Sequence, residues 1–233
     1  MSNDKNKINI KVVLMGDSQV GKTCFFTYLQ DKKFNPIHIA TIGFDNLIKE
    51  YNITIDNINY LVKLTLYDTA GQERYKSLTN SYFKNVDGII FMYDVTKKNS
   101  LININTWVEE MKKKNNSKKV ICAVLGNKID LLDKLNLHSQ KEENENEIID
   151  EDLKNIENIF IKDDIFVMFK KVSAKEGTNI DEFMNVYIKQ LAINKLEIIK
   201  EKNADKNNSN NRIIIAKNPE KKKKFSEKCC LFH

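Results

Sequence analysis

The sequence predicts an α/β protein in which helices cover both faces of a mostly parallel, six-stranded sheet with one antiparallel edge strand. Short apolar runs alternate with segments whose apolar residues recur at helical spacing, and this alternation is typical of a parallel sheet. Two neighbouring runs, 47–55 and 60–67, instead alternate apolar and polar residues on either side of Asp56 and Asn57. They predict a hairpin, which accounts for the antiparallel edge strand.

The other elements follow from their own apolar patterns. The first strand, 8–15, leads through a short loop to the helix-compatible segment 24–30, and 31–45 is a connecting loop. The amphipathic segment 101–114 has an apolar stripe that is typical of a helix packed on a core; the stripe consists of Ile104, Trp107, Val108 and Met111. The last helix, 180–201, has Phe183, Val186, Tyr187 and Leu191 on one face. Three more strands are expected at 87–93, 120–125 and 165–172, and a further helix at 148–160.

A glycine-containing loop follows the first strand. Its sequence, GDSQVGKT at Gly16–Thr23, matches G-x-x-x-x-G-K-[ST] at every fixed position, between a strand and a helix as this motif requires. Backbone N–H groups at the helix N-terminus would bind phosphates, Lys22 would add positive charge, and the Thr23 hydroxyl would ligate Mg²⁺. Gln19 is bulky for a loop that wraps phosphate and is a candidate for altering nucleotide exchange or hydrolysis. The expected phosphate-binding residues are Ser18, Gln19, Val20, Gly21, Lys22, Thr23 and Cys24.

A second motif, DTAGQERY at Asp68–Tyr75, begins where the strand 60–67 is expected to end. Ligands of open α/β sheets bind at the carboxyl ends of strands, so Asp68 is a candidate Mg²⁺ ligand. The backbone N–H of Gly71 can approach a terminal phosphate, and Gln72 can orient a water for in-line attack on that phosphate. A segment held by one phosphate is released when the phosphate leaves, and the motif therefore predicts a switch.

Two further segments are suited to reading a base. Asp130, in the sequence NKID, can accept hydrogen bonds from the N1–H and N2–H₂ edge of guanine, and adenine lacks that donor pair. Asn127 can bond the base and join neighbouring loops, while the stem of Lys128 covers the ring. The sequence SAK, which follows the strand 165–172, offers backbone contacts to the guanine carbonyl, although alone it also fits an ordinary loop. Its residues are Ser173, Ala174 and Lys175.

In this order, the segments GDSQVGKT, ATIGFD, DTAGQERY, GNKID and SAK resemble the Ras superfamily over roughly residues 8–200. ATIGFD, at Ala40–Asp45, and the two terminal cysteines are similar to the Rab branch. The resemblance implies the three-layer α/β/α fold of P-loop NTPases. It also implies a GTPase that cycles between GDP and GTP, uses Mg²⁺ and regulates vesicle traffic. By the same resemblance, Thr41 closes over Mg²⁺ and the γ-phosphate, and Phe34 lies against the guanine ring; Phe34 also fits a simple hydrophobic anchor.

The resemblance also implies partners. They are a GDP/GTP exchange factor, a GTPase-activating protein, a GDP-dissociation inhibitor, the prenylation machinery and effectors. Effectors would bind through Thr41–Asn46, Tyr67 and Gln72–Phe83. Intrinsic hydrolysis is expected to be slow, because no arginine of the chain is placed to stabilise the transition state; Arg74 more simply positions the mobile segment.

Two places depart from the family pattern. The hairpin region is about four residues longer than in a typical Rab, and the effector-facing positions hold Asn46, Tyr67 and Tyr82, where an aromatic residue is expected in place of Asn46. Around 133–147, the chain carries a charged, Asn- and Glu-rich insertion that cannot bury enough apolar surface to order itself. A solvated loop or a partner-specific segment both fit this insertion.

Composition sets the frame for these expectations. A chain of 233 residues, 41% hydrophobic, suits one domain (1–200) and a tail (201–233). Four cysteines give no disulfide framework, and Cys24 and Cys122 are expected to be inert thiols. No signal peptide or apolar run of ~18 residues occurs, which favours a cytosolic protein.

The tail carries most of the net charge. Residues 201–233 contain nine Lys or Arg and four Asp or Glu, a net charge of +5, against +6 for the whole chain. Lys221–Lys224 can attract anionic lipid headgroups. Nucleic acid is disfavoured as a partner, since no aromatic platform or basic groove accompanies the run.

The chain ends CCLFH, with adjacent Cys229 and Cys230. Two lipid chains are needed for stable anchoring, which favours prenylation of both cysteines. The competing interpretation is a C-a-a-X ending that would lipidate Cys230 alone. Either anchor predicts the cytoplasmic face of an intracellular membrane, with a cytosolic pool.

Two functions from different classes fit the sequence. The first is a membrane-anchored GTPase switch that recruits effectors in its GTP state, which Thr41 and Gln72 favour. The second is a GTP-binding scaffold with negligible hydrolysis, which Gln19 leaves open.

Overall fold

The fold is taken from a computed structural model that describes residues 6–33, 44–69, 85–114, 119–132 and 148–210. Six strands form one sheet in the order β2-β3-β1-β4-β5-β6. The strand bounds are β1 Lys7–Met15, β2 Phe44–Ile55, β3 Ile58–Thr69, β4 Gly88–Asp94, β5 Ile121–Asn127 and β6 Val167–Val172. Only the β2–β3 pairing is antiparallel, and it places β2 at an edge. The predicted α/β class, the six strands and the antiparallel edge are confirmed.

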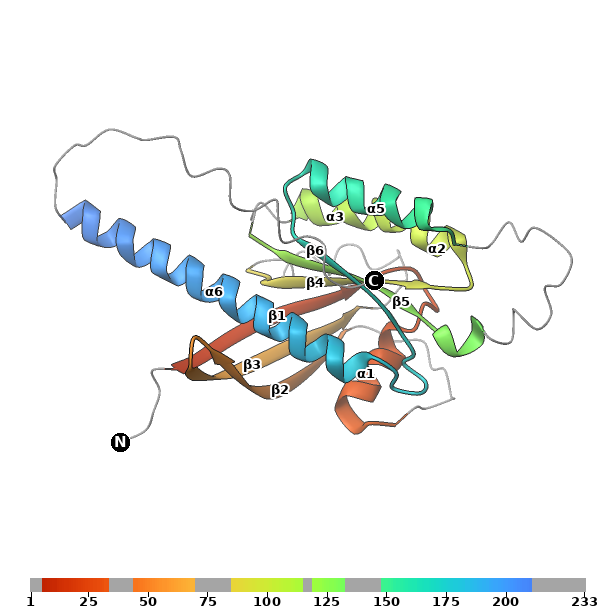
Figure 1. Ribbon diagram of the computed structural model, residues 1–233, viewed down its shortest axis with the longest axis horizontal. Coiled ribbons are helices and arrows are strands. Elements are labelled where there is room, and N and C mark those ends of the chain that lie inside the picture. The colour runs from red at the N-terminus through yellow and green to blue at the C-terminus, as the bar shows by residue number, and fades with distance from the viewer. Residues whose placement is uncertain (1–5, 34–43, 70–84, 115–118, 133–147, 211–233) are drawn as a thin grey trace, which may run out of the picture.

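Helices cover both faces of this sheet (Figure 1). Their bounds are α1 Lys22–Asp31, α2 Lys98–Ile102, α3 Ile104–Lys114, α5 Asp150–Lys162 and α6 Ile180–Asn210, with a short 3₁₀ turn, η4, at Ile129–Leu131. Side chains of α1 and α6 share one buried cluster with the sheet, and side chains of α3 and α5 share the other. Neighbouring residues of β1 serve both clusters, since Leu14 joins the first and Val13 the second. This alternation makes β1 the central strand of the three layers.

Several elements extend beyond their expected ends. The hairpin strands β2 and β3 pair over their whole length, because backbone hydrogen bonding continues past the apolar residues that revealed them. Their turn is at Asp56 and Asn57, as predicted, and both residues have positive φ, 49° and 63°. The expected helix 101–114 is instead two helices, α2 and α3, which meet at Asn103.

The largest difference between an expected and an observed element length is in the last helix, α6. The apolar pattern predicts that this helix ends at Glu201, but α6 continues to Asn210. Apolar periodicity fades there, yet helix formation needs only local backbone bonds and residues of adequate propensity, such as Glu201, Lys202 and Ala204. Figure 1 shows this end of α6 projecting beyond the sheet that its first turns cover.

The parallel strands bring five carboxyl ends to one edge of the sheet. Strands β2 and β3 lie on one side of β1, and β4, β5 and β6 lie on the other. Ligands of such sheets bind outside the carboxyl ends, where the strand order reverses. The carboxyl ends of β1, β3, β4, β5 and β6 therefore border one region.

Candidate nucleotide-binding site

The loop between β1 and α1 holds the start of the helix against β5. Gly21 caps α1 with a positive φ of 99°, and the Phe25 N–H donates to its carbonyl at 2.9 Å. A Cβ at Gly21 would lie only 2.2 Å from Nδ2 of Asn127. Glycine thus satisfies both the left-handed backbone and the close approach of the amide.

Lys22 lies inside this loop. Its side chain is buried, and Nζ donates to the carbonyls of Gly16 and Asp17, each at 2.7 Å. Burial lowers the pKa of Lys22 to about 8, although the charges of Asp68 and Asp17 oppose the shift. The ammonium therefore lies beside the start of α1, where helix N–H groups and the helix dipole favour an anion.

Thr23 and Asp68 contact each other beside Lys22. The Thr23 hydroxyl donates to Oδ2 of Asp68 at 2.7 Å, and Asp68 is only 1% exposed. Among the described residues, its Oδ1 is the one buried side-chain nitrogen or oxygen without a hydrogen-bond partner. Burial raises the pKa of this carboxyl, against the hydrogen bond from Thr23 and the charge of Lys22. A buried carboxylate oxygen with spare capacity beside a hydroxyl suits Mg²⁺, which prefers oxygen ligands.

Asn127, at the end of β5, joins three segments. Its Nδ2 donates to the carbonyl of Val20 in the β1–α1 loop at 2.9 Å. Its Oδ1 accepts from the backbone N–H of Ala174, after β6, also at 2.9 Å. The side chain is buried at 2% exposure. The expectation that Asn127 ties loops together is thus met by its contacts.

Asp130 lies in η4 and faces the loop after β6. The Ser173 hydroxyl donates to its Oδ1 at 2.6 Å, and the Glu176 N–H donates to that hydroxyl at 3.1 Å. Nζ of Lys175 lies 3.8 Å from Oδ2, and the Asp130 side chain is only 4% exposed. A carboxylate oriented in this way retains acceptor capacity for a ligand.

Lys128 has an ion-pair partner that the NKID motif does not predict. Its backbone has a positive φ of 73°, and Nζ lies 2.7 Å from Oδ2 of Asp94, the last residue of β4. Burial would raise the pKa of Asp94, but hydrogen bonds from Lys128 and Thr96 outweigh it and hold the pKa below its usual value. The sequence signal that could have identified Asp94 is a carboxylate at the carboxyl end of a predicted parallel strand.

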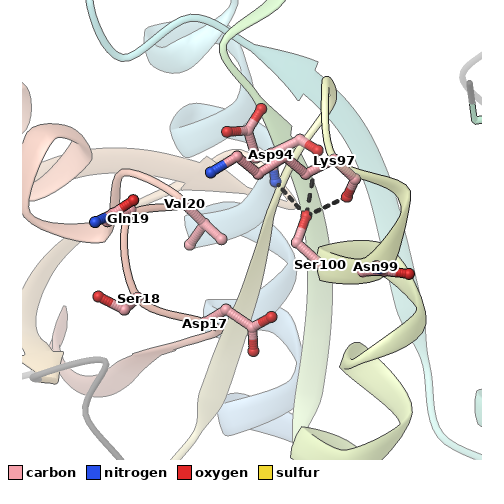
Figure 2. Close-up of a pocket in the computed structure, with 8 residues that line it drawn as sticks. All are labelled: Asp17, Ser18, Gln19, Val20, Asp94, Lys97, Asn99 and Ser100. Carbon is pink, nitrogen blue, oxygen red and sulfur yellow. Dashed lines mark hydrogen bonds between the residues drawn. The ribbon is translucent and has the colours of Figure 1, made fainter. Parts of the chain in front are cut away.

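A polar cavity of about 280 Å³ borders the β1–α1 loop, as Figure 2 shows. It lies between that loop and the connection from β4 to α2. The Ser100 hydroxyl organises this connection by bonding to Lys97 and Asp94. The cavity is lined by Asp17, Ser18, Gln19, Val20, Asp94, Lys97, Asn99 and Ser100.

Gln19 is the unusual residue of this loop. It is exposed and has a positive φ of 66°, a region that non-glycine residues adopt at a cost of about 1–2 kcal/mol. In Figure 2 its side chain points to the same side of the loop as that of Ser18. The neighbouring Cys24, on α1, is half-buried, and burial raises the pKa of its thiol.

The predicted residues thus fall into two sets. The structure brings together the residues of the loop before α1 with Asp68, Asn127, Lys128, Asp130, Ser173, Ala174 and Lys175. The other predicted site residues lie outside the described residues; they are Phe34, Thr41, Gly71, Gln72, Cys229 and Cys230.

Comparison with known proteins identifies the family. The family model described as Ras family matches residues 11–193. The GTP-binding protein ypt2 of Schizosaccharomyces pombe is 31% identical over 199 residues, which cover 85% of this chain and 89% of that protein. Ras-related protein Rab-13 of Canis lupus familiaris is 37% identical over 172 residues, 74% of each chain. The chain is a Rab small GTPase of the Ras family. Ras-related protein Rab-8B of Pongo abelii is 36% identical over 172 residues, 74% of this chain and 73% of that one.

Membership of the Rab family establishes the ligands and the reaction of this protein. This Rab GTPase binds GTP or GDP with Mg²⁺, hydrolyses GTP and is a GTP-binding switch of vesicle trafficking. Regulators and effectors are the general kinds of partner of a Rab GTPase, and its relatives associate with intracellular membranes. Within the described ranges, no helix combines the length and apolar character that crossing a bilayer requires. The expected family, fold, GTPase activity and cofactors are confirmed.

Proposed function

We propose that this Rab GTPase is a membrane-anchored switch that recruits effectors in its GTP state and releases them after hydrolysis. The observation that carries the proposal is the double hydrogen bond of Asn127, to the carbonyl of Val20 and from the N–H of Ala174. One buried amide thereby joins the phosphate loop to both segments suited to reading guanine. A nucleotide bound there would meet its phosphate and base contacts on a single connected scaffold.

The roles of individual residues follow from this scaffold. Phosphates would occupy the start of α1, close to Lys22, and the oxygens of Thr23 and Asp68 would hold Mg²⁺. Asp130, held by Ser173, accepts the hydrogen bonds of the guanine edge. With Mg²⁺ bound, the metal neutralises charge that develops on the phosphates. These assignments rest on the arrangement of the described side chains.

Hydrolysis and signalling depend on the two segments that flank the site. Gln72 orients the attacking water, and Thr41 closes over Mg²⁺ and the γ-phosphate. Effectors then bind Thr41–Asn46, Tyr67 and Gln72–Phe83 while that phosphate is present. In support of a continuous surface, Asn46 on β2 pairs directly with Tyr67 on β3. Tyr82, the third residue of this set, lies outside the described residues.

The tail supplies the membrane anchor. Prenylation of Cys229 and Cys230 gives two lipid chains, and Lys221–Lys224 adds attraction to anionic headgroups. An exchange factor, a GTPase-activating protein that provides an arginine, and a GDP-dissociation inhibitor complete the cycle.

Replacement of Gln72 tests the switch. Gln72→Leu removes the group that orients water, so we expect single-turnover GTP hydrolysis to slow by at least about tenfold while GTP binding is retained. The protein would then stay in its GTP state and keep its effectors. The measurement is phosphate release from the preloaded full chain.

Gln30→Leu is the matched control, because Gln30 is exposed at the end of α1. It should hydrolyse GTP at the wild-type rate. Equal rates for wild type and Gln72→Leu would remove the proposed role of Gln72. If the wild type itself shows no turnover, even with activating proteins present, the chain acts as a GTP-binding scaffold.

A further inference from the structure

The carboxylate of Asp17 connects the phosphate loop to helix α3. Its Oδ1 accepts a hydrogen bond from Nε1 of Trp107 at 2.9 Å, and its Oδ2 accepts one from Nδ2 of Asn103 at 2.7 Å. In Figure 2 the Asp17 side chain points to the opposite side of the loop from Ser18 and Gln19. Both carboxylate oxygens are thus engaged by the α2–α3 segment, 86 and 90 residues away in sequence.

The backbone of the same residue touches the phosphate-binding lysine. The Asp17 carbonyl accepts from Nζ of Lys22 at 2.7 Å. The position of Asp17 therefore sets the position of one of the two carbonyls that hold Lys22. Any motion of Asp17 relative to α3 would move the loop around the ammonium, and it would also shift the loop N–H groups at the start of α1.

Helix α3 is packed firmly enough to restrain this loop. Ile104, Val108 and Met111 are buried on its inner face, in the cluster shared with β4 and β5. Trp107 is half-buried at the edge of that cluster, with its N–H directed at Asp17. Such packing limits the freedom of the indole, so the hydrogen bond restrains the loop more than the helix.

We propose that Trp107 and Asn103 are positioning residues for the nucleotide: they hold the phosphate loop through Asp17 and thereby slow nucleotide release. The inference rests on the proposed role of the β1–α1 loop as the phosphate site. A loop fixed in its binding conformation loses less conformational entropy when phosphate binds, and this preorganisation increases affinity. Most of such a gain is found in the dissociation rate.

Removal of the indole N–H tests the proposal. Trp107→Phe keeps an aromatic ring in the cluster but leaves Oδ1 of Asp17 without this donor. We expect release of a fluorescent GDP analogue from the full chain to accelerate by about three- to tenfold, since hydrogen bonds to a charged group are among the stronger ones. Asn103→Ala should have a smaller effect, about twofold, because its bond is exposed.

Asn105→Ala is the matched control, because Asn105 is exposed on α3 two residues from Trp107. Its release rate should equal that of the wild type. A double-mutant cycle with Asp17→Ala separates positioning from general destabilisation. Without the carboxylate, Trp107→Phe should change the release rate by less than about twofold; additive effects of the two substitutions would overturn the proposal.

A second readout needs no substitution. Trp107 is the single tryptophan of the chain, so tryptophan emission comes only from the side chain that makes this contact. Coupling is reciprocal: if the Trp107–Asp17 bond favours bound nucleotide, bound nucleotide favours the bond. Emission from wild-type protein should therefore change when GDP is removed, and an unchanged spectrum would overturn the proposal.

The results of these experiments also show whether the positioning role or the proposed nucleotide site is wrong. If the wild type fails to bind GDP at all, or binds it with Lys22→Ala unchanged in affinity, then the site assignment has failed. If the wild type binds GDP, Lys22→Ala weakens binding and Trp107→Phe releases GDP at the wild-type rate, then only the positioning role is wrong.

Discussion

The proposed recognition of guanine depends on how one carboxylate is held. Asp130 has a side chain that is only 4% exposed, and it accepts a hydrogen bond from Ser173 at 2.6 Å. The Lys175 ammonium lies 3.8 Å from its other oxygen. The carboxylate is therefore restrained without being saturated, because each oxygen can accept more than one bond. Under the proposed function, guanine would be selected because any other base would leave this acceptor unpaired.

Replacement of Asp130 by Asn tests this assignment. The amide turns one acceptor into a donor, which opposes the guanine edge and matches the extra carbonyl of xanthine. We expect affinity for GTP to fall at least about 100-fold and discrimination against xanthosine triphosphate to be relaxed. Equilibrium titration with both nucleotides measures the two effects.

Asp31→Asn provides the matched control, since Asp31 is exposed at the end of α1. It should leave both affinities unchanged. An Asp130→Asn protein that binds GTP as tightly as the wild type would show that another group reads the base.

At the scale of elements, α6 approaches β4 through a glycine. A Cβ at Gly88 would lie 2.5 Å from Oη of Tyr187 and 2.8 Å from Cδ2 of Leu191. The Tyr187 hydroxyl donates at 2.8 Å to the carbonyl of Ile121, and the carbonyl of Ile89 is 3.2 Å away. Helix and sheet are therefore fitted around a buried hydroxyl, with no room for a methyl group at this position.

Gly88→Ala should destabilise this contact. Overpacking of a filled core costs about 1–3 kcal/mol, and we expect the free energy of unfolding to fall by that amount. Urea denaturation measures the change. Tyr187→Phe removes the atom closest to the added methyl, so the double variant should lose less stability than the two single variants summed.

If the double variant loses as much stability as the two single variants summed, this account of the helix–sheet contact is wrong. Tyr187→Phe alone should cost about 1–2 kcal/mol, because a buried carbonyl loses its donor. The Tyr187→Phe variant therefore measures how much the hydroxyl contributes to the free energy of unfolding, and this value is needed to interpret the double variant.

At the scale of the whole molecule, charge separates the folded part from the tail. Residues 201–233 carry +5 of the total +6, so the remainder is nearly neutral. Helix α6 continues into this region as far as Asn210. The basic run Lys221–Lys224 and the terminal cysteines thus follow a helix that extends past the sheet (Figure 1). A neutral domain joined to a basic, lipidated end would favour the membrane through the tail alone.

Loss of both terminal cysteines should release the protein from membranes. Cys229→Ser with Cys230→Ser removes both proposed sites of lipidation, and we expect a tagged full-length chain to move into the cytosolic fraction of cells. Single replacements should give intermediate retention, because one lipid chain binds only reversibly. Cell fractionation measures the distribution.

Ser226→Ala in the same tail is the control and should leave the distribution unchanged. Complete release by Cys230→Ser alone, with no effect of Cys229→Ser, would favour the C-a-a-X interpretation. Retention of the double variant would place the anchor elsewhere in the chain.

The sequence alone determined the fold class and the family, and it predicted the chemical groups of the site. The loop motif at Gly16–Thr23 and the alternating runs of the hairpin are short-range features, and their physical causes act within a few residues. The hairpin turn at Asp56 and Asn57 was predicted for the same reason. Element ends were less well predicted, since backbone pairing and local helix propensity continue past the apolar residues that mark a pattern.

Only the tertiary structure decided which of these groups touch. Helical spacing predicts that Trp107 belongs to a core stripe, but its N–H donates to Asp17. No sequence pattern indicates that Asp94 is the partner of Lys128. Such contacts join residues 34 to 90 positions apart. They exist because a parallel sheet aligns the carboxyl ends of strands that are distant in sequence, and no local pattern records which side chains then meet across that edge.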